Sequence, residues 1–333
     1  MEAVFVRHIF SFIFPLLLTI YIVPMMIAAA FNFKILDRPD GKIKNHKKPV
    51  PYLGGLAVYI PFIATLAVAY PFENKILWLF LGVTFLLFIG LVDDLKILKP
   101  IQKLFGQFLA VLCFLKGGFS LKTIFFSDFF NICASAFWML SVINAFNLVD
   151  VMDGLSSLLA IIAATSFLII AIILKQYAVS VLLLAFLGPM LVFFYYNKPP
   201  ARIYLGDAGS LFVGGFLAAI PLLLPWSKLS FDAYYTPIVI LGVPLLELFS
   251  LVVIRTFKGI AFYRGSPHHY SIYLRSKNWS VAKVLIFSGI MSTILSTIAI
   301  LFLFNFINFW SLISFCVVFF LLTQFARKVF TKT

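Results

Sequence analysis

Residues 144–174 read NAFNLVDVMDGLSSLLAIIAATSFLIIAIIL, a short polar row followed by a long apolar run. From Leu155 to Leu174 the run carries no charged residue. An apolar run of about 20 residues is long enough to cross a bilayer as a helix. A helix satisfies its own backbone hydrogen bonds in lipid, and the alternating pattern of a membrane barrel is absent. The stretch therefore predicts a transmembrane helix that begins beside a polar motif.

The rest of the chain repeats this pattern. Of its 333 residues, 63% are hydrophobic and only 11% are charged, and the mean hydropathy is +1.08. We predict one all-α polytopic membrane domain over residues 1–333, with about eleven transmembrane helices, ten being the alternative. The spans are expected near 9–31, 53–71, 76–92, 101–116, 130–147, 154–174, 177–196, 208–225, 236–255, 281–304 and 308–326. The first is interpreted as a retained helix and not as a cleaved signal peptide.

The charge distribution predicts the orientation in the membrane. With eleven spans, 20 of the 26 lysine and arginine residues lie on one side of the membrane and 6 on the other. The positive-inside rule places the richer side in the cytoplasm, so the N-terminus is outside and the C-terminus is cytoplasmic. Every polar motif then falls on the cytoplasmic side, in loops at about 32–52, 93–103, 147–154, 197–207 and 256–280.

The pair Asp93-Asp94 ends a predicted span. Carboxylates are costly near lipid and are unfavourable at a helix C-terminus, so a divalent metal or nearby lysines should offset them. Paired carboxylates suit Mg²⁺, and the lysines that follow, Lys96 and Lys103 among them, suit phosphate as point charges. The simpler alternative is an acidic stop after a membrane span.

Polar residues recur at every third position in the row Asn144, Asn147, Asp150 and Asp153. Such a row drifts around an α-helix, which has about 3.6 residues per turn. The segment therefore either breaks near Gly154 or wraps a cavity. Asparagine capping and hydrogen bonds between helices are the structural alternative.

A further motif is Gly206-Asp207-Ala208-Gly209-Ser210. We expect its glycines to let the backbone approach a ligand, and a helix starting after Asp207 to offer N–H groups to a phosphate. The alternative is that Asp207 only caps this helix.

Two basic segments complete the set of motifs. The vicinal pair His268-His269 could bind phosphate or act as acid or base, or could belong to an ordinary polar loop. The segment 42–51 carries Lys42 and His46 and is expected to contact anionic lipids and a diphosphate. The isolated Glu247 inside a predicted span is interpreted as an interhelical hydrogen-bonding residue.

Taken together and in order, these motifs resemble those of the polyprenyl-phosphate N-acetylhexosamine-1-phosphate transferases. That family includes bacterial undecaprenyl-phosphate GlcNAc-1-phosphate transferases and phospho-MurNAc-pentapeptide transferase. The resemblance rests on His46 with Pro49-x-Pro51-x-x-Gly54-Gly55, Asp93-Asp94 with Lys96, Lys103 and Gln107, the row from Asn144 to Asp153 with Gly154-Leu155, Gly206-Asp207-x-Gly209-Ser210-Leu211, and the late histidines.

The resemblance implies a transfer of sugar-1-phosphate, GlcNAc-1-phosphate first of all, from a UDP-sugar to polyprenyl phosphate, with release of UMP. It also implies Mg²⁺, with Mn²⁺ as a substitute, and a place at the cytoplasmic face of a bacterial inner membrane. Such an enzyme would initiate assembly of a cell-surface glycan such as cell wall, lipopolysaccharide or O-antigen. The resemblance allows a homodimer, and no nucleic-acid partner is expected.

Residue roles implied by the resemblance follow the motif matches. The catalytic residues would be Asp93, Asp94, Asp207 and His269, of which the three aspartates would also hold the metal. The substrate-binding residues would be Lys42, His46, Lys96, Lys103, Asn147, Asp150, Asp153, Asn197 and His268.

Three departures from the family pattern bear on the donor. Val151 stands where family members usually have glycine, and the later histidines of the late motif are missing. Two apolar spans follow the histidines, and the basic loop lacks the Thr-Pro-Thr-Met-Gly-Gly pattern, which together favour UDP-GlcNAc over UDP-MurNAc-pentapeptide. The alternatives are that pentapeptide donor, another UDP-HexNAc, or, in a different class, a cation-coupled transporter, against which the placement of the acids at span ends argues.

Overall fold

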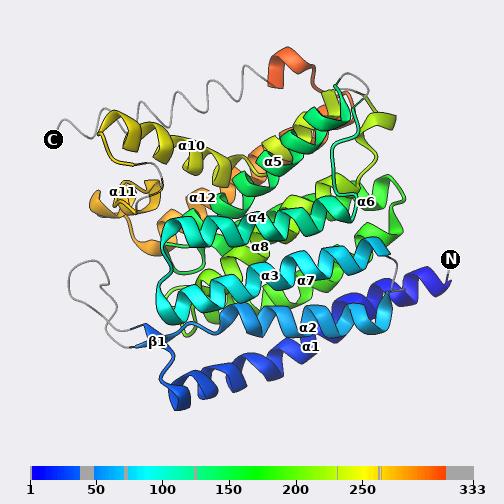
Figure 1. Cartoon of the computed structure of the whole chain (residues 1–333). Coiled ribbons are helices and arrows are strands. Elements are labelled where there is room, and N and C mark those ends of the chain that lie inside the picture. Colours follow the sequence, from blue (N-terminus) through cyan, green and yellow to red (C-terminus); the bar gives the residue numbers. More distant parts are fainter. Residues whose placement is uncertain are drawn as a thin grey trace.

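Long helices lying side by side form almost all of the chain that the structure describes (Figure 1). This computed structural model describes residues 2–37, 49–70, 74–123, 126–230, 232–261, 263 and 265–312. The elements in order are α1 (Glu2–Phe33), β1 (Leu36–Asp37), β2 (Val50–Pro51), α2 (Gly54–Ala69), α3 (Asn74–Lys96), α4 (Pro100–Lys116), α5 (Asp128–Val149), α6 (Leu155–Ile173), α7 (Tyr177–Asn197), α8 (Gly206–Ala219), the 3-10 turns η1 (Ile220–Leu223), η2 (Trp226–Lys228) and η3 (Asp232–Tyr235), α9 (Thr236–Ile240), α10 (Gly242–Phe257), α11 (Tyr270–Ser276) and α12 (Val281–Leu303).

The prediction of an all-α polytopic membrane protein is confirmed, whereas the count of eleven spans is not. Among the described residues, seven helices are long and apolar enough to cross a membrane, or eight if α9 and α10 form one bent span. Helices α2 and α4, predicted as spans, have only 16 and 17 residues. Most of the predicted span 308–326 lies outside the described residues.

Helix α8 lies at the centre of the bundle and packs against α2, α3 and α5. Every residue of α8 is buried except Asp207. Aromatic rings hold it against α2 and α7: Phe62 of α2 lies edge-on to Phe216, and Phe186 of α7 stacks on the same ring. Such ring pairs add stability beyond the area they bury. The core therefore fixes the helix whose first turn carries Asp207.

Glycines let α2 and α3 come unusually close to the first turn of α8. A Cβ atom on Gly55 would lie 2.4 Å from the backbone nitrogen of Gly209, and one on Gly90 would lie 2.3 Å from the carbonyl carbon of Asp207. Gly206 has a φ of +72°, and a Cβ atom there would lie 2.7 Å from Asp94 Oδ2. The glycines of this motif thus serve contacts within the protein, and their close approach to a ligand stays a prediction.

The predicted polar motifs gather at one end of the bundle, on the left in Figure 1. Helices α3, α5 and α7 end there, and α4, α6 and α8 begin there, whereas α1 begins at the opposite end. The antiparallel pair β1–β2 lies at the same end. Next to it, Tyr204 N–H donates to the carbonyl of Pro51 at 2.8 Å and Gly54 N–H donates to the carbonyl of Tyr204 at 3.0 Å. These bonds tie the loop before α8 to the strand before α2.

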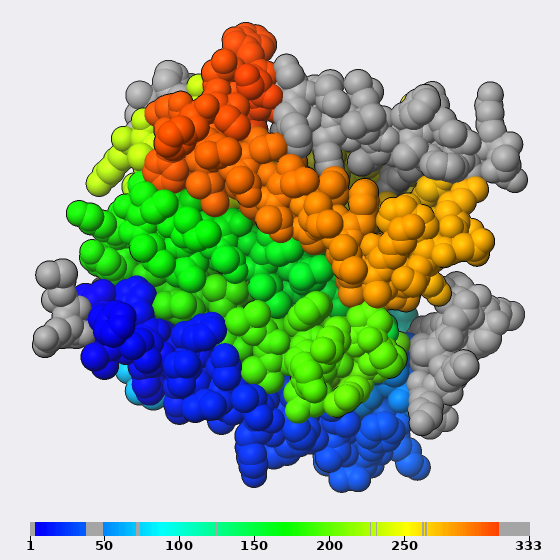
Figure 2. Space-filling model, turned by 180° about the vertical axis from the view of Figure 1, so that it is seen from behind, coloured from blue at the N-terminus to red at the C-terminus, as the bar shows by residue number. Residues whose placement is uncertain are grey.

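The predicted span 236–255 is broken rather than continuous. Asp232–Ile240 and Gly242–Phe257 meet at an angle of 80°. Beyond this bend, α10 extends beside α5 towards the short helix α11 (Figure 1). On the opposite face, α12 lies alongside α6 (Figure 2). The bend therefore carries the charged end of α10 to the segment that contains the late histidines.

Candidate functional site

A lysine lies between two carboxylates where α3, α4 and α8 meet. Lys103 Nζ lies 2.9 Å from Asp93 Oδ2 and 2.9 Å from Asp207 Oδ1. Asp93 also accepts the backbone N–H of Leu98 at 2.6 Å, which fixes the turn between α3 and α4. Ion pairs this well shielded from water interact more strongly than exposed ones. The prediction that lysines offset the carboxylates at the end of α3 is confirmed for Asp93.

Asp94 is held by the start of α8. Its Oδ1 accepts the backbone N–H of Asp207 at 2.8 Å, and its Oδ2 accepts that of Ala208 at 3.0 Å. A helix N-terminus stabilises an anion through its free N–H groups and its dipole. The positive end of α8, which we expected to meet a phosphate, therefore meets a carboxylate of α3 in this structure.

The row from Asn144 to Asp153 crosses the break between α5 and α6. Helix α5 ends at Val149, Gly154 has a φ of +74°, and α6 begins at Leu155, so the predicted break near Gly154 is confirmed. Inside α5, Asn144 exchanges two hydrogen bonds with Gln107 of α4, at 2.8 and 3.2 Å. The row thus begins as a contact between helices and ends as a loop at the site.

Two members of the row face the carboxylates. The Asn147 side chain donates to Asp207 Oδ1 and, at 3.0 Å, to Ser210 Oγ, and its own oxygen accepts from Lys103 Nζ at 3.2 Å. Burial raises the pKa of the Asp150 carboxyl well above its usual range, and the charges of Asp207 and Asp94 raise it further. Asp150 therefore belongs to the same electrostatic group as the other acids.

Two other predicted site residues hold loops together. Asp153 Oδ2 accepts the N–H of Ala201 at 2.9 Å, across the gap between the α5–α6 and α7–α8 loops. Asn197 is buried and makes three such contacts: its oxygen accepts from Gly154 N–H at 3.1 Å and Ser157 Oγ at 2.8 Å, and its nitrogen donates to the carbonyl of Ile203 at 2.9 Å. Both residues therefore hold the α5–α6 and α7–α8 loops together beside the site. Their contact with substrate stays a prediction.

The late histidines are held by α10. His268 Nε2 lies 2.8 Å from Lys258 Nζ, and burial together with the charges of Lys258 and Arg255 lowers the pKa of His268. His269 is buried, and its Nδ1 lies 3.1 Å from Glu247 Oε1. The interpretation of Glu247 as a hydrogen-bonding residue is confirmed, because it accepts the N–H of Tyr270 at 3.1 Å.

The remaining predicted residues lie apart from this cluster or are not described. Lys96 is exposed at the end of α3, and Lys42 and His46 lie outside the described residues. Sequence reasoning gave no role to Tyr52 and Tyr204, whose rings lie 6.2 Å apart. Burial raises the pKa of both hydroxyls, and the acids nearby raise them further, Asp37 for Tyr52 and Asp153 for Tyr204. Only their position beside the Pro-x-x-Gly-Gly and Gly-Asp motifs could have indicated them.

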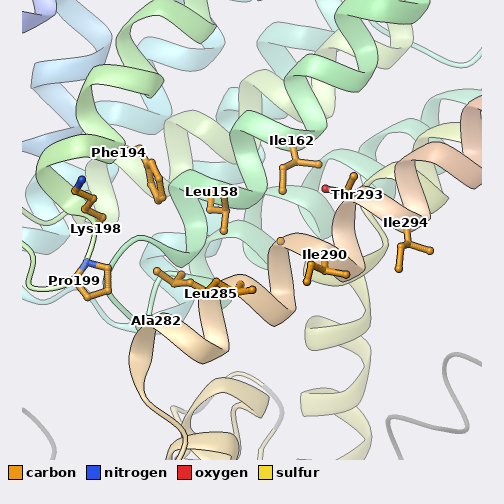
Figure 3. Close-up of a pocket in the computed structure, with 12 residues that line it drawn as sticks. Leu158, Ile162, Phe194, Lys198, Pro199, Ala282, Leu285, Ile290, Thr293 and Ile294 are labelled. Atoms are coloured by element: carbon orange, nitrogen blue, oxygen red, sulfur yellow. The ribbon is translucent and has the colours of Figure 1, made fainter.

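An apolar cavity of about 750 Å³ lies beside the site, between α6, α12 and the end of α7 (Figure 3). Lys198 and Pro199 mark one end of it, and Thr293 and Ile294 lie towards the other. Within the part of the chain that the structure describes, no carboxylate lines it, so it is separate from the acidic cluster. Gly154 links the two, since a Cβ atom there would lie 3.4 Å from the Cα of Lys198.

The carboxylates can be tested for their fit to Mg²⁺. Among the described residues, no group of three His, Cys, Asp or Glu side chains is arranged to hold a metal ion. Mg²⁺ does not need such a group, because it keeps several waters and binds through one or two carboxylates together with substrate phosphates. Asp207, whose side chain is 33% exposed, is more open than Asp93, whose side chain is 9% exposed and which lies across Lys103 from it. The oxygen donors therefore fit this ion.

We expect Asp94→Asn to lower the stability of the protein by about 1–2 kcal/mol, because hydrogen bonds to a charged acceptor at a helix N-terminus are stronger than neutral ones. Asp94→Ala should cost more, since it leaves both N–H groups of α8 without their acceptor. Turnover should fall steeply in both variants because the same turn carries Asp207. Thermal unfolding of the purified variants in detergent measures the effect, and an unchanged Asp94→Ala midpoint would contradict it.

Comparison with known proteins places the chain in a family. The model of "Glycosyl transferase family 4" matches residues 76–225, the stretch from α3 to η1 that holds the whole acidic cluster. The chain is 31% identical over 305 residues to the phospho-N-acetylmuramoyl-pentapeptide-transferase of Bacillus cytotoxicus, covering 83% of this chain and 90% of the relative. The chain belongs to glycosyl transferase family 4.

Other relatives in this family are a probable undecaprenyl-phosphate N-acetylglucosaminyl 1-phosphate transferase and further pentapeptide transferases. The former, from Bacillus subtilis (strain 168), is 30% identical over 253 residues, which cover 73% of this chain and 70% of the relative. A pentapeptide transferase of Lactococcus lactis subsp. cremoris (strain MG1363) is 29% identical over 335 residues, covering 88% and 97%. The resemblance predicted from the motifs is thus confirmed, and both kinds of relative match at similar identity.

Proposed function

We propose that this family 4 protein transfers a sugar-1-phosphate, GlcNAc-1-phosphate first of all, from a UDP-sugar to polyprenyl phosphate. The observation that carries the proposal is the group formed by Asp93, Lys103, Asn147 and Asp207 at one end of an apolar bundle. It joins cationic and carboxylate groups where a lipid phosphate and a soluble nucleotide can meet. The names of the relatives point to the same substrates.

The reaction requires little covalent help from the protein. An oxygen of the lipid phosphate forms a bond to the β-phosphorus of the donor, the bond from that phosphorus to the bridging oxygen breaks, and UMP leaves with that oxygen. Catalysis of such a transfer consists mainly of positioning and charge neutralisation. Bound Mg²⁺, or Mn²⁺ in its place, would supply part of that neutralisation beside Asp207 and Asp93.

Each member of the cluster has a task under this proposal. Lys103 offers a positive charge to a phosphate and is held between Asp93 and Asp207. Asn147 orients the Asp207 side chain. Asp94 fixes the first turn of α8 and acts on the reaction by placing Asp207. These contacts organise the site before any substrate arrives, which is the condition for electrostatic catalysis.

The proposal includes the orientation of the protein. The N-terminus lies outside, the polar end of the bundle faces the cytoplasm of a bacterium, and the chain crosses the inner membrane about eleven times, the short helices α2 and α4 included. The excess of lysine and arginine in the loops at the polar end supports this orientation. A homodimer is part of the proposal as well. Product released at this face would feed assembly of a cell-surface glycan.

The decisive experiment is a donor panel. Purified protein is incubated with undecaprenyl phosphate, Mg²⁺ and one labelled donor at a time: UDP-GlcNAc, UDP-GalNAc or UDP-MurNAc-pentapeptide. We expect lipid-soluble label and equimolar UMP with UDP-GlcNAc, and loss of both when EDTA is added. A panel without lipid-soluble label for any donor, in the presence of a working reference transferase, would overturn the proposal.

UDP-MurNAc-pentapeptide is the second candidate donor. Pentapeptide transferases match this chain at 29–32% identity and over more of its length than the Bacillus subtilis relative does. The same panel separates the two donors, since the preferred one gives the higher kcat/KM.

A further inference from the structure

Two side chains of α10, and that of Lys258 directly after it, hold the histidine segment, and each contacts a different residue of that segment. Arg255 Nε donates to Ser266 Oγ at 2.9 Å. Lys258 Nζ lies 2.8 Å from His268 Nε2. Glu247 accepts the backbone N–H of Tyr270 at 3.1 Å and faces the His269 ring. The segment from Ser266 to Tyr270 is therefore fastened along one helix, outside the residues that the family model matches.

The contact between Glu247 and His269 is the most deeply buried of these. Glu247 is 2% exposed and His269 is 6% exposed, and Nδ1 and Oε1 lie 3.1 Å apart. Nδ1 makes no hydrogen bond in this geometry, so its contact with Glu247 is an electrostatic one between the carboxylate and the ring. At this short distance and depth of burial the carboxylate favours the ring orientation that keeps Nδ1 towards it. With Nδ1 turned to Glu247, the nitrogen that remains for a substrate oxygen is Nε2.

We propose that Glu247 is a positioning residue for His269: its carboxylate fixes the orientation of the ring, so that Nε2 is presented to the diphosphate of the donor. This role rests on the transferase function proposed above. It gives a task to an intramembrane acid that the acidic cluster at α3, α4 and α8 does not use. The bend before α10 supports it, because from that bend α10 extends towards α11, which begins directly after His269.

A second attachment of α11 provides a matched control. The Tyr270 hydroxyl lies 2.8 Å from Ser288 Oγ on α12. This bond anchors the same short helix without touching the His269 ring. Tyr270→Phe therefore loosens the anchoring of α11, whereas Glu247→Gln removes the carboxylate charge but keeps an oxygen that can accept the Tyr270 N–H.

The first experiment is a double-mutant cycle on kcat with Glu247→Gln and His269→Ala. Alone, Glu247→Gln should lower kcat by about 10- to 100-fold with little change in KM, since a misplacement of about 1 Å near the reacting atoms can cost about 100-fold. In the His269→Ala background it should cost less than about twofold, because residues that act through one another are not additive. The factor by which Tyr270→Phe changes kcat should be the same in the parent, in Glu247→Gln and in His269→Ala. Losses from Glu247→Gln and His269→Ala that simply multiply would overturn the proposal.

The second experiment does not depend on turnover. Carbethoxylation of histidines by diethyl pyrocarbonate is followed by mass spectrometry, with His8 of α1, at the opposite end of the bundle, as an internal reference. The rate at His269 should rise about fivefold in Glu247→Gln, because the ring loses its electrostatic interaction with the carboxylate, and it should stay at the parent rate in Tyr270→Phe. An equal rate of modification at His269 in the parent and in Glu247→Gln would overturn the proposal that Glu247 positions the ring. If the parent transfers no sugar from any donor, only the proposed function fails, and this measurement still decides on Glu247.

Discussion

Asp207→Asn should lower turnover by about 10³-fold while the protein still folds, the size of loss seen when a key electrostatic group is removed from a preorganised site. The side chain keeps its shape, so it can retain its contact with Asn147. It loses the charge that faces Lys103 at 2.9 Å. Lys103 remains paired with Asp93, which limits the structural damage.

The measurement is UMP release under saturating donor and lipid, together with thermal unfolding of the same preparation. Asp128→Asn is the matched control, because Asp128 also lies in the first turn of a helix but is exposed at the opposite end of the bundle. The control should retain parent turnover. Near-parent turnover in Asp207→Asn would remove this residue from the site.

Gly55→Ala should lower stability by about 3 kcal/mol, the upper part of the range for overpacked cores. The new methyl group would lie 2.4 Å from the backbone nitrogen of Gly209 and 2.7 Å from its Cα atom. Backbone cannot turn away as a side chain can, so α2 and α8 must separate. Because Asp207 lies in the same turn of α8, turnover should fall together with stability.

The unfolding midpoint in detergent tests this second prediction. Gly265→Ala serves as the control, since a Cβ atom there meets nothing within 4 Å and the residue needs no positive φ. It should unfold at the parent temperature. A parent-like midpoint in Gly55→Ala would contradict the prediction, because it would mean that α2 and α8 can separate at little cost in stability.

The gathering of the acids could be predicted because it depends on patterns within single segments. The three-residue spacing from Asn144 to Asp153 does not fit a continuous helix, and the chain does break at Gly154. The adjacent carboxylates Asp93 and Asp94 needed positive partners, and Lys103, only ten residues away, is one of them. Helix direction then placed these motifs at one end of the bundle.

Contacts between distant segments could not be predicted in this way. The binding of Asp94 to the first turn of α8 depends on the register of two helices more than 100 residues apart, which glycines at both positions set. The pairing of Glu247 with His269 depends on the 80° bend before α10, where Pro244 follows without fixing the angle. The periodicity of the sequence shows neither the register between α3 and α8 nor the angle of the bend before α10.

The count of eleven spans is not confirmed for a related reason. Apolar runs such as 53–71 and 101–116 measure composition, whereas the helix lengths depend on where the chain turns. Gly54 starts α2 because its backbone is fastened to the Tyr204 loop, and Pro100 starts α4 after the Asp93 turn. Contacts that their own sequences do not show therefore decide where both helices start at the site.

The shortness of α2 and α4 has a consequence for the surrounding lipid. At about 1.5 Å per residue, helices of 16 and 17 residues are about 24–26 Å long, whereas the hydrocarbon core of a bilayer is about 30 Å thick. Large apolar side chains of α4, including Phe105 and Phe108, are exposed along its outer side. Hydrophobic mismatch of this kind is relieved by local thinning of the bilayer. Beside α4 the headgroup layer should therefore dip towards Lys103, which shortens the path that a lipid-borne phosphate must travel to reach a substrate dissolved in water.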